Sequence, residues 1–149
     1  MIELVPFAPR HVVFAARLEE ICFSSPWSEA ALAEEIENPD AYFIAAEEDG
    51  VFLGYAGMHT PCGDCYVDNI AVEPAARRRG VGEALVRGLI EHAQTIGGTF
   101  ISLEVRPSNT AALHLYEKLG FSQAGRRKNF YTRPTEDGLI LTKTLESAV

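Results

Sequence analysis

The segment Tyr66–Leu89 constrains the fold most, because it joins an apolar strand to an amphipathic helix through a turn rich in arginine and glycine. The apolar run Ile70–Val72 is closed by Glu73-Pro74, since the residue before a proline avoids helical angles and proline cannot extend a strand ladder. From Val81 onward, apolar residues recur at steps of three and four, the period of a helix with one buried face. The segment therefore predicts a strand, a tight turn and a helix that begins near Gly80.

The turn Arg77–Gly82 has the composition of an anion site. Gly80 and Gly82 carry no side chain, so backbone N–H groups can close on a ligand at the positive end of the helix dipole, as a pyrophosphate requires. No lysine follows either glycine, which argues against a Walker A loop, and Leu85 together with the mid-chain position argues against a dinucleotide fingerprint. A plain glycine connection with solvated arginines is the alternative.

Composition limits the class of protein. A chain of 149 residues with 47% apolar content fits one domain, residues 1–149. No run of about 18 apolar residues occurs, and the first residues lack the pattern of a secretory signal, so we expect a cytoplasmic protein with no membrane partner. The formal charge of −8 argues against nucleic-acid binding and fits a basic peptide partner better. The acidic clusters are either a solvated surface or a rim that steers a cationic substrate.

Hydrophobic periodicity and turn residues predict an alternation of strands and helices. The predicted strands are 2–5, 42–46, 51–59, a strand from Tyr66 to Val72, 100–105, 122–130 and 139–145, and the predicted helices are 9–22, 28–38, 80–96 and 109–119. Asp49-Gly50 is a hairpin signal, and the polar stretch Thr132–Asp137 is expected to form a mobile loop. The unit from Tyr66 to Val105 is a right-handed crossover between parallel strands, whose carboxyl ends should share one crevice.

Two side chains near that crevice are candidates for chemistry. Glu104 interrupts the apolar alternation of its strand and points to the opposite face from Leu103. It is either a site carboxylate, an exposed ion or a partner of Arg106. Tyr116 follows Asn109 by two helical turns, so both can line a channel, although Tyr116 can equally be a core residue.

The cysteines do not indicate a metal centre. His59, Cys62 and Cys65 have a spacing compatible with zinc, but three clustered ligands with one CxxC form a weak signal, so no metal is expected. An odd count of three cysteines without a secretory context predicts free thiols.

The turn and several other motifs together resemble a known family. Arg77-x-x-Gly80-x-Gly82 is similar to the acetyl-CoA pyrophosphate loop of the GCN5-related N-acetyltransferases, and the resemblance covers essentially the whole chain. Within that superfamily the chain most resembles the ribosomal-protein-alanine N-acetyltransferases. The matching segments are Pro26-Trp27-Ser28, Asn69-Ile70-Ala71-Val72, Leu103-Glu104-Val105-Arg106, Ser108-Asn109, Leu115-Tyr116-x-x-Leu119-Gly120-Phe121 and Asn129-Phe130-Tyr131.

The resemblance implies an α/β fold with a mixed, mostly antiparallel sheet of six or seven strands, a parallel β-α-β unit and about four helices. It implies Glu104 as general base, Tyr116 as general acid, and Trp27 and Tyr131 beside the peptide. The acetyl-CoA site would comprise Ile70, Ala71, Val72, Arg77, Arg78, Arg79, Gly80, Val81, Gly82, Glu83, Asn109 and Tyr116.

The implied reaction is acetylation of the N-terminal alanine of a small-subunit ribosomal protein, by a monomer. An α-amine, with a pKa near 8, is roughly 2.5 units easier to deprotonate than a lysine, which suits a single carboxylate base. The alternatives are acetylation of a lysine or small amine, and a non-catalytic acyl-CoA sensor.

Overall fold

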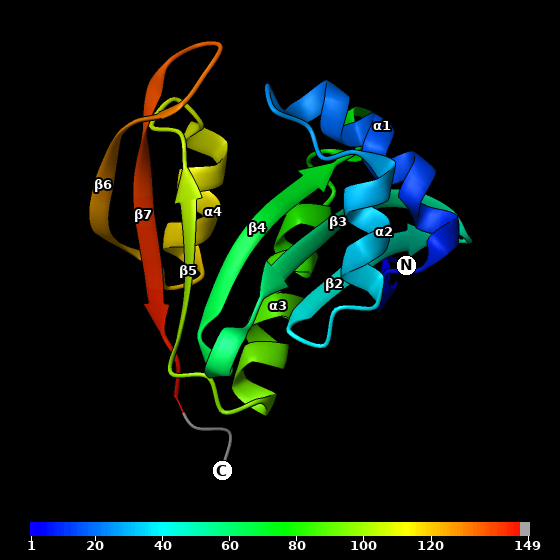
Figure 1. The fold of residues 1–149 in the computed structure, drawn as a ribbon, viewed down its shortest axis with the longest axis horizontal. Helices are drawn as coiled ribbons and strands as arrows, with labels where there is room; N and C mark the ends of the chain where they lie inside the picture. The colour runs from blue at the N-terminus through cyan, green and yellow to red at the C-terminus, as the bar shows by residue number, and fades with distance from the viewer. Residues whose placement is uncertain (147–149) are drawn as a thin grey trace.

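The structure, a computed structural model, describes residues 1–146 and contains one seven-stranded sheet with helices on both faces (Figure 1). The strands are β1 (Glu3–Pro6), β2 (Ala41–Glu48), β3 (Val51–His59), β4 (Cys65–Val72), β5 (Phe100–Val105), β6 (Ser122–Tyr131) and β7 (Glu136–Thr144). The helices are α1 (Val12–Cys22), α2 (Glu29–Ile36), α3 (Val81–Thr95) and α4 (Thr110–Lys118). This arrangement confirms the predicted α/β class.

The sheet has the order β1-β2-β3-β4-β5-β7-β6, and β4 with β5 is its one parallel pair in the described chain. Helix α3 connects these two strands, as expected for the predicted crossover connection. Its pairing covers only Cys65 with Ile101 and Tyr66 with Ser102. Beyond those residues the two strands diverge, which Figure 1 shows as a widening gap between their arrowheads. Along most of their length, the facing edges of β4 and β5 are therefore not paired with each other.

A bulge lies where β4 leaves β5. Gly57 of β3 pairs with Asn69, while the next residue, Met58, pairs with Val67, so Asp68 is an extra residue in β4. A bulge bends its strand and increases its twist. The bend therefore falls at the start of the separated part of β4.

The helices cover both faces of the sheet. Helix α3 packs against β2, β3 and β4 on one face, and α1 and α2 pack on the other (Figure 1). Strand β2 is buried on both sides, because Ile44 and Ala46 enter the core under α3 while Phe43 and Ala45 enter the core under α1 and α2. No helix within residues 1–146 is long and apolar enough to cross a lipid bilayer.

Local signals placed several elements correctly. Asp49 and Gly50 both have positive φ, at 52° and 79°, as a two-residue hairpin requires. Ser28 caps α2 by accepting a hydrogen bond from the N–H of Ala31. The expected loop at 132–137 is shorter than predicted, because β7 begins at Glu136, whose carboxylate is held by Arg106.

Gly54 permits the close approach of β3 to β4. A Cβ at this position would lie 2.5 Å from the carbonyl oxygen of Ala71 and 3.1 Å from Cα of Val72, both backbone atoms that cannot rotate away. We expect Gly54→Ala to lower the free energy of unfolding by roughly 1–3 kcal/mol, measured by urea denaturation. The matched control is Gly125→Ala, whose Cβ would meet Ile140 at an ordinary 3.4 Å. Equal stability of the two variants would contradict this account of β3–β4 packing.

Candidate active site

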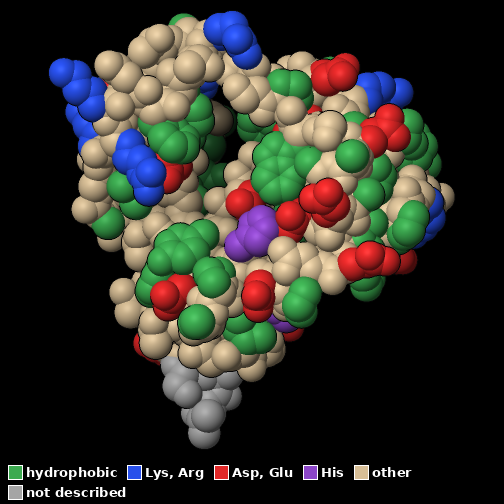
Figure 2. Space-filling model, viewed as in Figure 1, with side chains coloured by type: hydrophobic (Ala, Val, Ile, Leu, Met, Phe, Trp, Pro, Cys, Tyr) green, Lys and Arg blue, Asp and Glu red, His purple; other side chains and the backbone are tan. Residues whose placement is uncertain are grey.

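A cleft of about 910 Å³ lies between the diverging halves of β4 and β5. Figure 2 shows the molecule hollowed between its two parts on this face. The cleft is lined by the segment after α1, by β4, β5 and α4, and by the β6–β7 turn. The lining residues are Cys22, Phe23, Ser24, Ser25, Tyr66, Val67, Asp68, Asn69, Ile70, Ser102, Leu103, Glu104, Val105, Arg106, Asn109, Ala112, Tyr116, Arg127, Phe130, Tyr131, Thr132, Arg133 and Pro134.

Glu104 lies in this cleft on the less buried face of β5, as its place in the alternation predicted. Its Oε1 is 3.2 Å from Nε of Arg127, whereas its Oε2 is buried and makes no hydrogen bond within residues 1–146. Burial raises the pKa of the Glu104 carboxyl, and the positive charge of Arg127 partly opposes that rise. Arg106 is paired with Glu136 instead, so the expected alternative of a Glu104–Arg106 pair was wrong. Glu104 thus presents one oxygen free to accept a proton.

Tyr116 and Asn109 reach the same cleft from α4. Asn109 caps the helix, its Oδ1 accepting the N–H of Ala112 at 3.2 Å, so it both ends the loop and lines the cleft. Tyr116 is 9% exposed, and its ring centre lies 5.6 Å from that of Phe121. Burial raises the pKa of its phenol, which therefore carries its proton at neutral pH. Tyr116 is at once a core residue and a cleft residue.

The β6–β7 turn closes over one end of the cleft. Arg106 at the end of β5 donates to the carbonyl oxygens of Pro134 and Thr132, at 2.7 and 2.9 Å, and its guanidinium lies 4.5 Å from the ring centre of Tyr131. The hydroxyl of Ser24, after α1, donates to the carbonyl of Thr132 at 2.7 Å. Burial, with the Glu104 charge adding to it, raises the pKa of Tyr131 to about 12. The turn, the end of β5 and the segment after α1 therefore form one hydrogen-bonded roof.

The predicted anion turn sits at the start of α3. Gly80 has φ of 83° and provides no side-chain cap, and the first helical bond runs from the N–H of Ala84 to its carbonyl, at 3.0 Å. The N–H groups of Val81, Gly82 and Glu83 are consequently free of helical partners, as at every helix start. Apart from the adjoining backbone, no atom of the described chain lies within 4 Å of the place that a Cβ on Gly80 would occupy. Open space and unpaired donors at a positive helix end fit a phosphate group.

The three arginines of the turn have different surroundings. Arg77 donates to the carbonyl of Val72 at 3.3 Å and to Sγ of Cys22 at 3.5 Å, and Arg79 pairs with Glu48. Arg78 is exposed and makes no hydrogen bond or ion pair in the described part of the chain. Arg78 is therefore the arginine most available to an anion.

The other candidate residues lie outside the cleft lining. Ala71 is buried and Val72 pairs with Gly54 of β3, so they can contribute only backbone groups along the free edge of β4. Glu83 forms ion pairs with Lys118 and Arg87, which leaves its N–H as its contribution to the turn. Trp27 does not line the cleft, and its ring lies 5.9 Å from the ring of Phe43.

The cysteines are free thiols, as predicted. His59 contacts Asp68 and Glu35 rather than Cys62 and Cys65. Among the described residues, no group of three or more histidine, cysteine, aspartate or glutamate side chains is arranged to hold a metal ion.

Sequence reasoning missed three features, two in the cleft lining and one in the core next to it. Arg127 of β6 pairs with Glu104 of β5 although β7 lies between these two strands in the sheet, and no local sequence pattern reveals such a contact. Arg106 was considered only as a possible partner of Glu104, although it organises the roof. The third is Glu19, a carboxylate in the buried stripe of α1 one turn after Ala15, and that position in the stripe was a readable signal.

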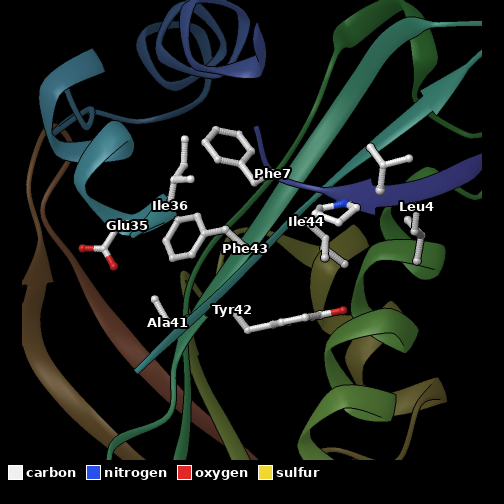
Figure 3. Close-up of a pocket in the computed structure, with 10 residues that line it drawn as sticks. Leu4, Phe7, Glu35, Ile36, Ala41, Tyr42, Phe43 and Ile44 are labelled. Carbon is white, nitrogen blue, oxygen red and sulfur yellow. The ribbon is translucent and has the colours of Figure 1, made fainter. Parts of the chain in front are cut away.

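A second, smaller cavity of about 250 Å³ lies by β1, β2 and the end of α2 (Figure 3). Figure 3 shows Phe7, Ile36 and Phe43 gathered around it. Its lining is mainly apolar, and its one carboxylate, Glu35, is paired with His59. Its lining residues include no set of side chains suited to catalysis.

Comparison with known proteins agrees with this geometry. The profile of the acetyltransferase (GNAT) family matches residues 13–121. The N-alpha-acetyltransferase RimI of Mycobacterium tuberculosis is 38% identical over 122 residues, 78% of this chain and 75% of that protein. The [ribosomal protein bS18]-alanine N-acetyltransferase of Escherichia coli K12 is 36% identical over 125 residues, 83% of this chain and 82% of that protein.

Solved structures share the whole fold. The crystal structure of the ribosomal-protein-S18-alanine N-acetyltransferase from Escherichia coli superimposes with a TM-score of 0.89 at 30% identity, covering 100% of this chain and 97% of that one. A Salmonella typhimurium protein, yncA, solved with its cofactor acetyl-CoA, has a TM-score of 0.83 at 17% identity, with 99% and 96% coverage. The chain belongs to the GNAT family of acetyltransferases.

Proposed function

We propose that this acetyltransferase moves the acetyl group of acetyl-CoA to the α-amine of a protein N-terminus, with the N-terminal alanine of ribosomal protein bS18 as its substrate. The observation that carries the proposal is the cleft that brings Glu104, with an unpartnered buried oxygen, together with Tyr116, a buried phenol. The names of the relatives at 36% and 38% identity support the substrate class.

The residues present fit acetyl-CoA. Its diphosphate matches the unpaired N–H groups of Val81, Gly82 and Glu83 and the free guanidinium of Arg78. Its extended arm matches the free edge of β4 along Ile70–Val72, where an added chain can form strand-like hydrogen bonds. Asn109 lies along the same cleft. The thioester supplies an activated acetyl group.

Within the cleft, Glu104 removes a proton from the incoming α-ammonium group, directly or through one water at Oε2. The neutral amine nitrogen then forms a bond to the thioester carbonyl carbon, the carbon–sulfur bond breaks, and the second proton of the nitrogen passes to solvent as the amide forms. Backbone N–H groups on the free edge of β4 stabilise the oxyanion. Tyr116 donates its phenolic proton to the departing thiolate. A phenol with a raised pKa stays protonated until a stronger base forms next to it, and its proton is then replaced from solvent.

The test of the substrate is a thiol-release assay with two peptides. One carries the bS18 N-terminal sequence with a free α-amine, and the other has the same sequence with a blocked N-terminus and an added internal lysine. We expect CoA release with the first peptide alone. Release with the blocked peptide at the same rate would assign the enzyme to lysine acetylation, and binding of acetyl-CoA without release on any amine would make it an acyl-CoA sensor.

The role of Arg127 gives a pH prediction. Its charge stabilises the ionised form of Glu104, so Arg127→Gln raises the pKa of that carboxyl further above its ordinary value of 4.5. The base must be ionised to act, so the acid limb of the pH profile of kcat/KM moves to higher pH. The control is Arg126→Gln, which loses a pair with Asp137 outside the cleft. Coincident acid limbs for the two variants and the wild type would contradict the assignment of Glu104 as the titrating base.

A further inference from the structure

Glu19 is a carboxylate inside the protein core that the proposed chemistry does not use. It lies on the buried stripe of α1 beside Leu18, and both side chains are 0% exposed. No arginine, lysine or histidine is within ion-pair distance of it among the described residues. Burying an unpaired carboxylate is costly unless hydrogen bonds satisfy it, and an apolar residue would fill this position at lower cost.

Four hydrogen bonds converge on the Glu19 carboxylate. Its Oε1 accepts the backbone N–H of Trp27 at 2.9 Å and the amide nitrogen of Asn69 at 3.1 Å. Its Oε2 accepts the hydroxyl of Tyr55 at 2.5 Å and the same Asn69 nitrogen at 3.0 Å. Two of these donor groups, the backbone N–H of Trp27 and the side-chain nitrogen of Asn69, can only donate, so they complement an ionised carboxylate. Burial raises the pKa of Glu19 and the hydrogen bonds oppose that rise.

These contacts come from three segments of the chain, two of which adjoin the cleft. Asn69 lines the cleft at the β4 bulge, where β4 has left β5. The Trp27 N–H follows Phe23–Ser25, which also line the cleft. Tyr55 belongs to β3 and is fully buried. One carboxylate therefore connects β4 and the segment after α1, which both line the cleft, to the core.

The same contacts determine how the Asn69 amide is oriented. Its nitrogen lies within 3.1 Å of both carboxylate oxygens, so its Oδ1 is turned away from Glu19. That oxygen makes no hydrogen bond within the described chain, and it belongs to a residue of the cleft lining. A peptide whose N-terminus enters the cleft carries N–H donors that such an oxygen can accept.

We propose that Glu19 is a positioning residue for the acceptor substrate: it orients the Asn69 amide so that Oδ1 accepts a hydrogen bond from an N–H of the bound peptide. The inference rests on the proposed peptide substrate. The acetyl-CoA half of the site is separate, since the start of α3 makes no contact with this carboxylate.

Glu19→Gln tests the proposal at nearly constant volume. Whichever way the glutamine amide turns, its nitrogen replaces an oxygen that now accepts from Asn69, so two donors face each other and Asn69 must move. We expect the peptide KM to rise about tenfold, as the loss of one charge-assisted hydrogen bond predicts, with kcat and the Kd of acetyl-CoA nearly unchanged. Glu20→Gln, an exposed change of the same kind on the same helix, is the control and leaves all three constants unchanged.

Asn69→Ala separates positioning from folding. We expect this variant alone to raise the peptide KM, and the double variant Glu19→Gln/Asn69→Ala to match it, because Glu19 acts through Asn69. Additive effects in the double variant, or an unchanged peptide KM in Asn69→Ala, would overturn the proposal. The single Asn69 change also decides the question if Glu19→Gln does not fold.

If the wild type acetylates no peptide, the proposed substrate is wrong and the peptide KM cannot be measured. A measurement that does not depend on turnover then tests the role of Glu19. The side-chain amide protons of Asn69 in ¹⁵N-labelled protein should exchange slowly in the wild type and in Glu20→Gln, and rapidly in Glu19→Gln. Slow exchange retained in Glu19→Gln would show that Glu19 does not fix this amide.

Discussion

We expect Glu104→Gln to lower kcat for acetyl transfer by about 10²- to 10⁴-fold, the range that a positioned general base contributes. Glutamine has nearly the same shape but cannot take a proton, so the buried, unpartnered Oε2 position loses its function. The Kd of acetyl-CoA, measured by calorimetry, should not change, because the carboxylate lies on β5 while the proposed diphosphate site lies at the start of α3.

Stability separates this loss from misfolding. The pKa of Glu104 is raised in the folded protein, so at neutral pH its ionised form is less favourable there than in the unfolded chain. Removing the charge should therefore leave the melting temperature unchanged or raise it. Glu117→Gln, an exposed change on α4, is the control for activity. A Glu104→Gln enzyme with wild-type kcat at neutral pH would eliminate this carboxylate as the base.

The second large effect is expected from Tyr116→Phe, which should lower kcat by about 10²-fold or more. The phenyl ring keeps the packing against Phe121, but the cleft loses the proton that the departing thiolate needs. The peptide KM and the Kd of acetyl-CoA should stay near their wild-type values, since the hydroxyl acts on the leaving group.

Two other tyrosines make this prediction specific. Tyr42→Phe, at a ring stacked 3.6 Å from His92 outside the cleft, should leave kcat unchanged. Tyr131→Phe, in the roof, should raise the peptide KM more than it lowers kcat. If Tyr131→Phe abolishes turnover and Tyr116→Phe does not, the acid is Tyr131.

Much of the fold followed from local chemistry. The proline after Glu73, the helical period from Val81 and the Asp49-Gly50 turn each predicted an element that the structure contains. Glu104 could be placed because a charged residue in an apolar alternation must face away from the buried side. These signals depend on neighbouring residues, which is why one sequence suffices to read them.

The cleft itself could not be predicted in the same way. Its existence depends on β4 and β5 pairing over two residue pairs and then separating at the Asp68 bulge, and strand periodicity does not show where pairing stops. The Arg127–Glu104 pair and the contacts of Glu19 with Tyr55 and Asn69 join residues more than 20 positions apart. Such contacts arise from topology and register, so they appear only once the chain is folded.

The most direct test of the account is a crystal structure with a bisubstrate analogue, CoA joined through its sulfur to the α-amine of an alanine-starting peptide. We predict that the diphosphate contacts the N–H groups of Val81–Glu83 and that the sulfur lies beside the hydroxyl of Tyr116. The former amine nitrogen should be within reach of Oε2 of Glu104, at about 2.6–3.2 Å or through one water. An analogue bound with its sulfur outside the cleft between β4 and β5, or out of reach of both residues, would contradict the account.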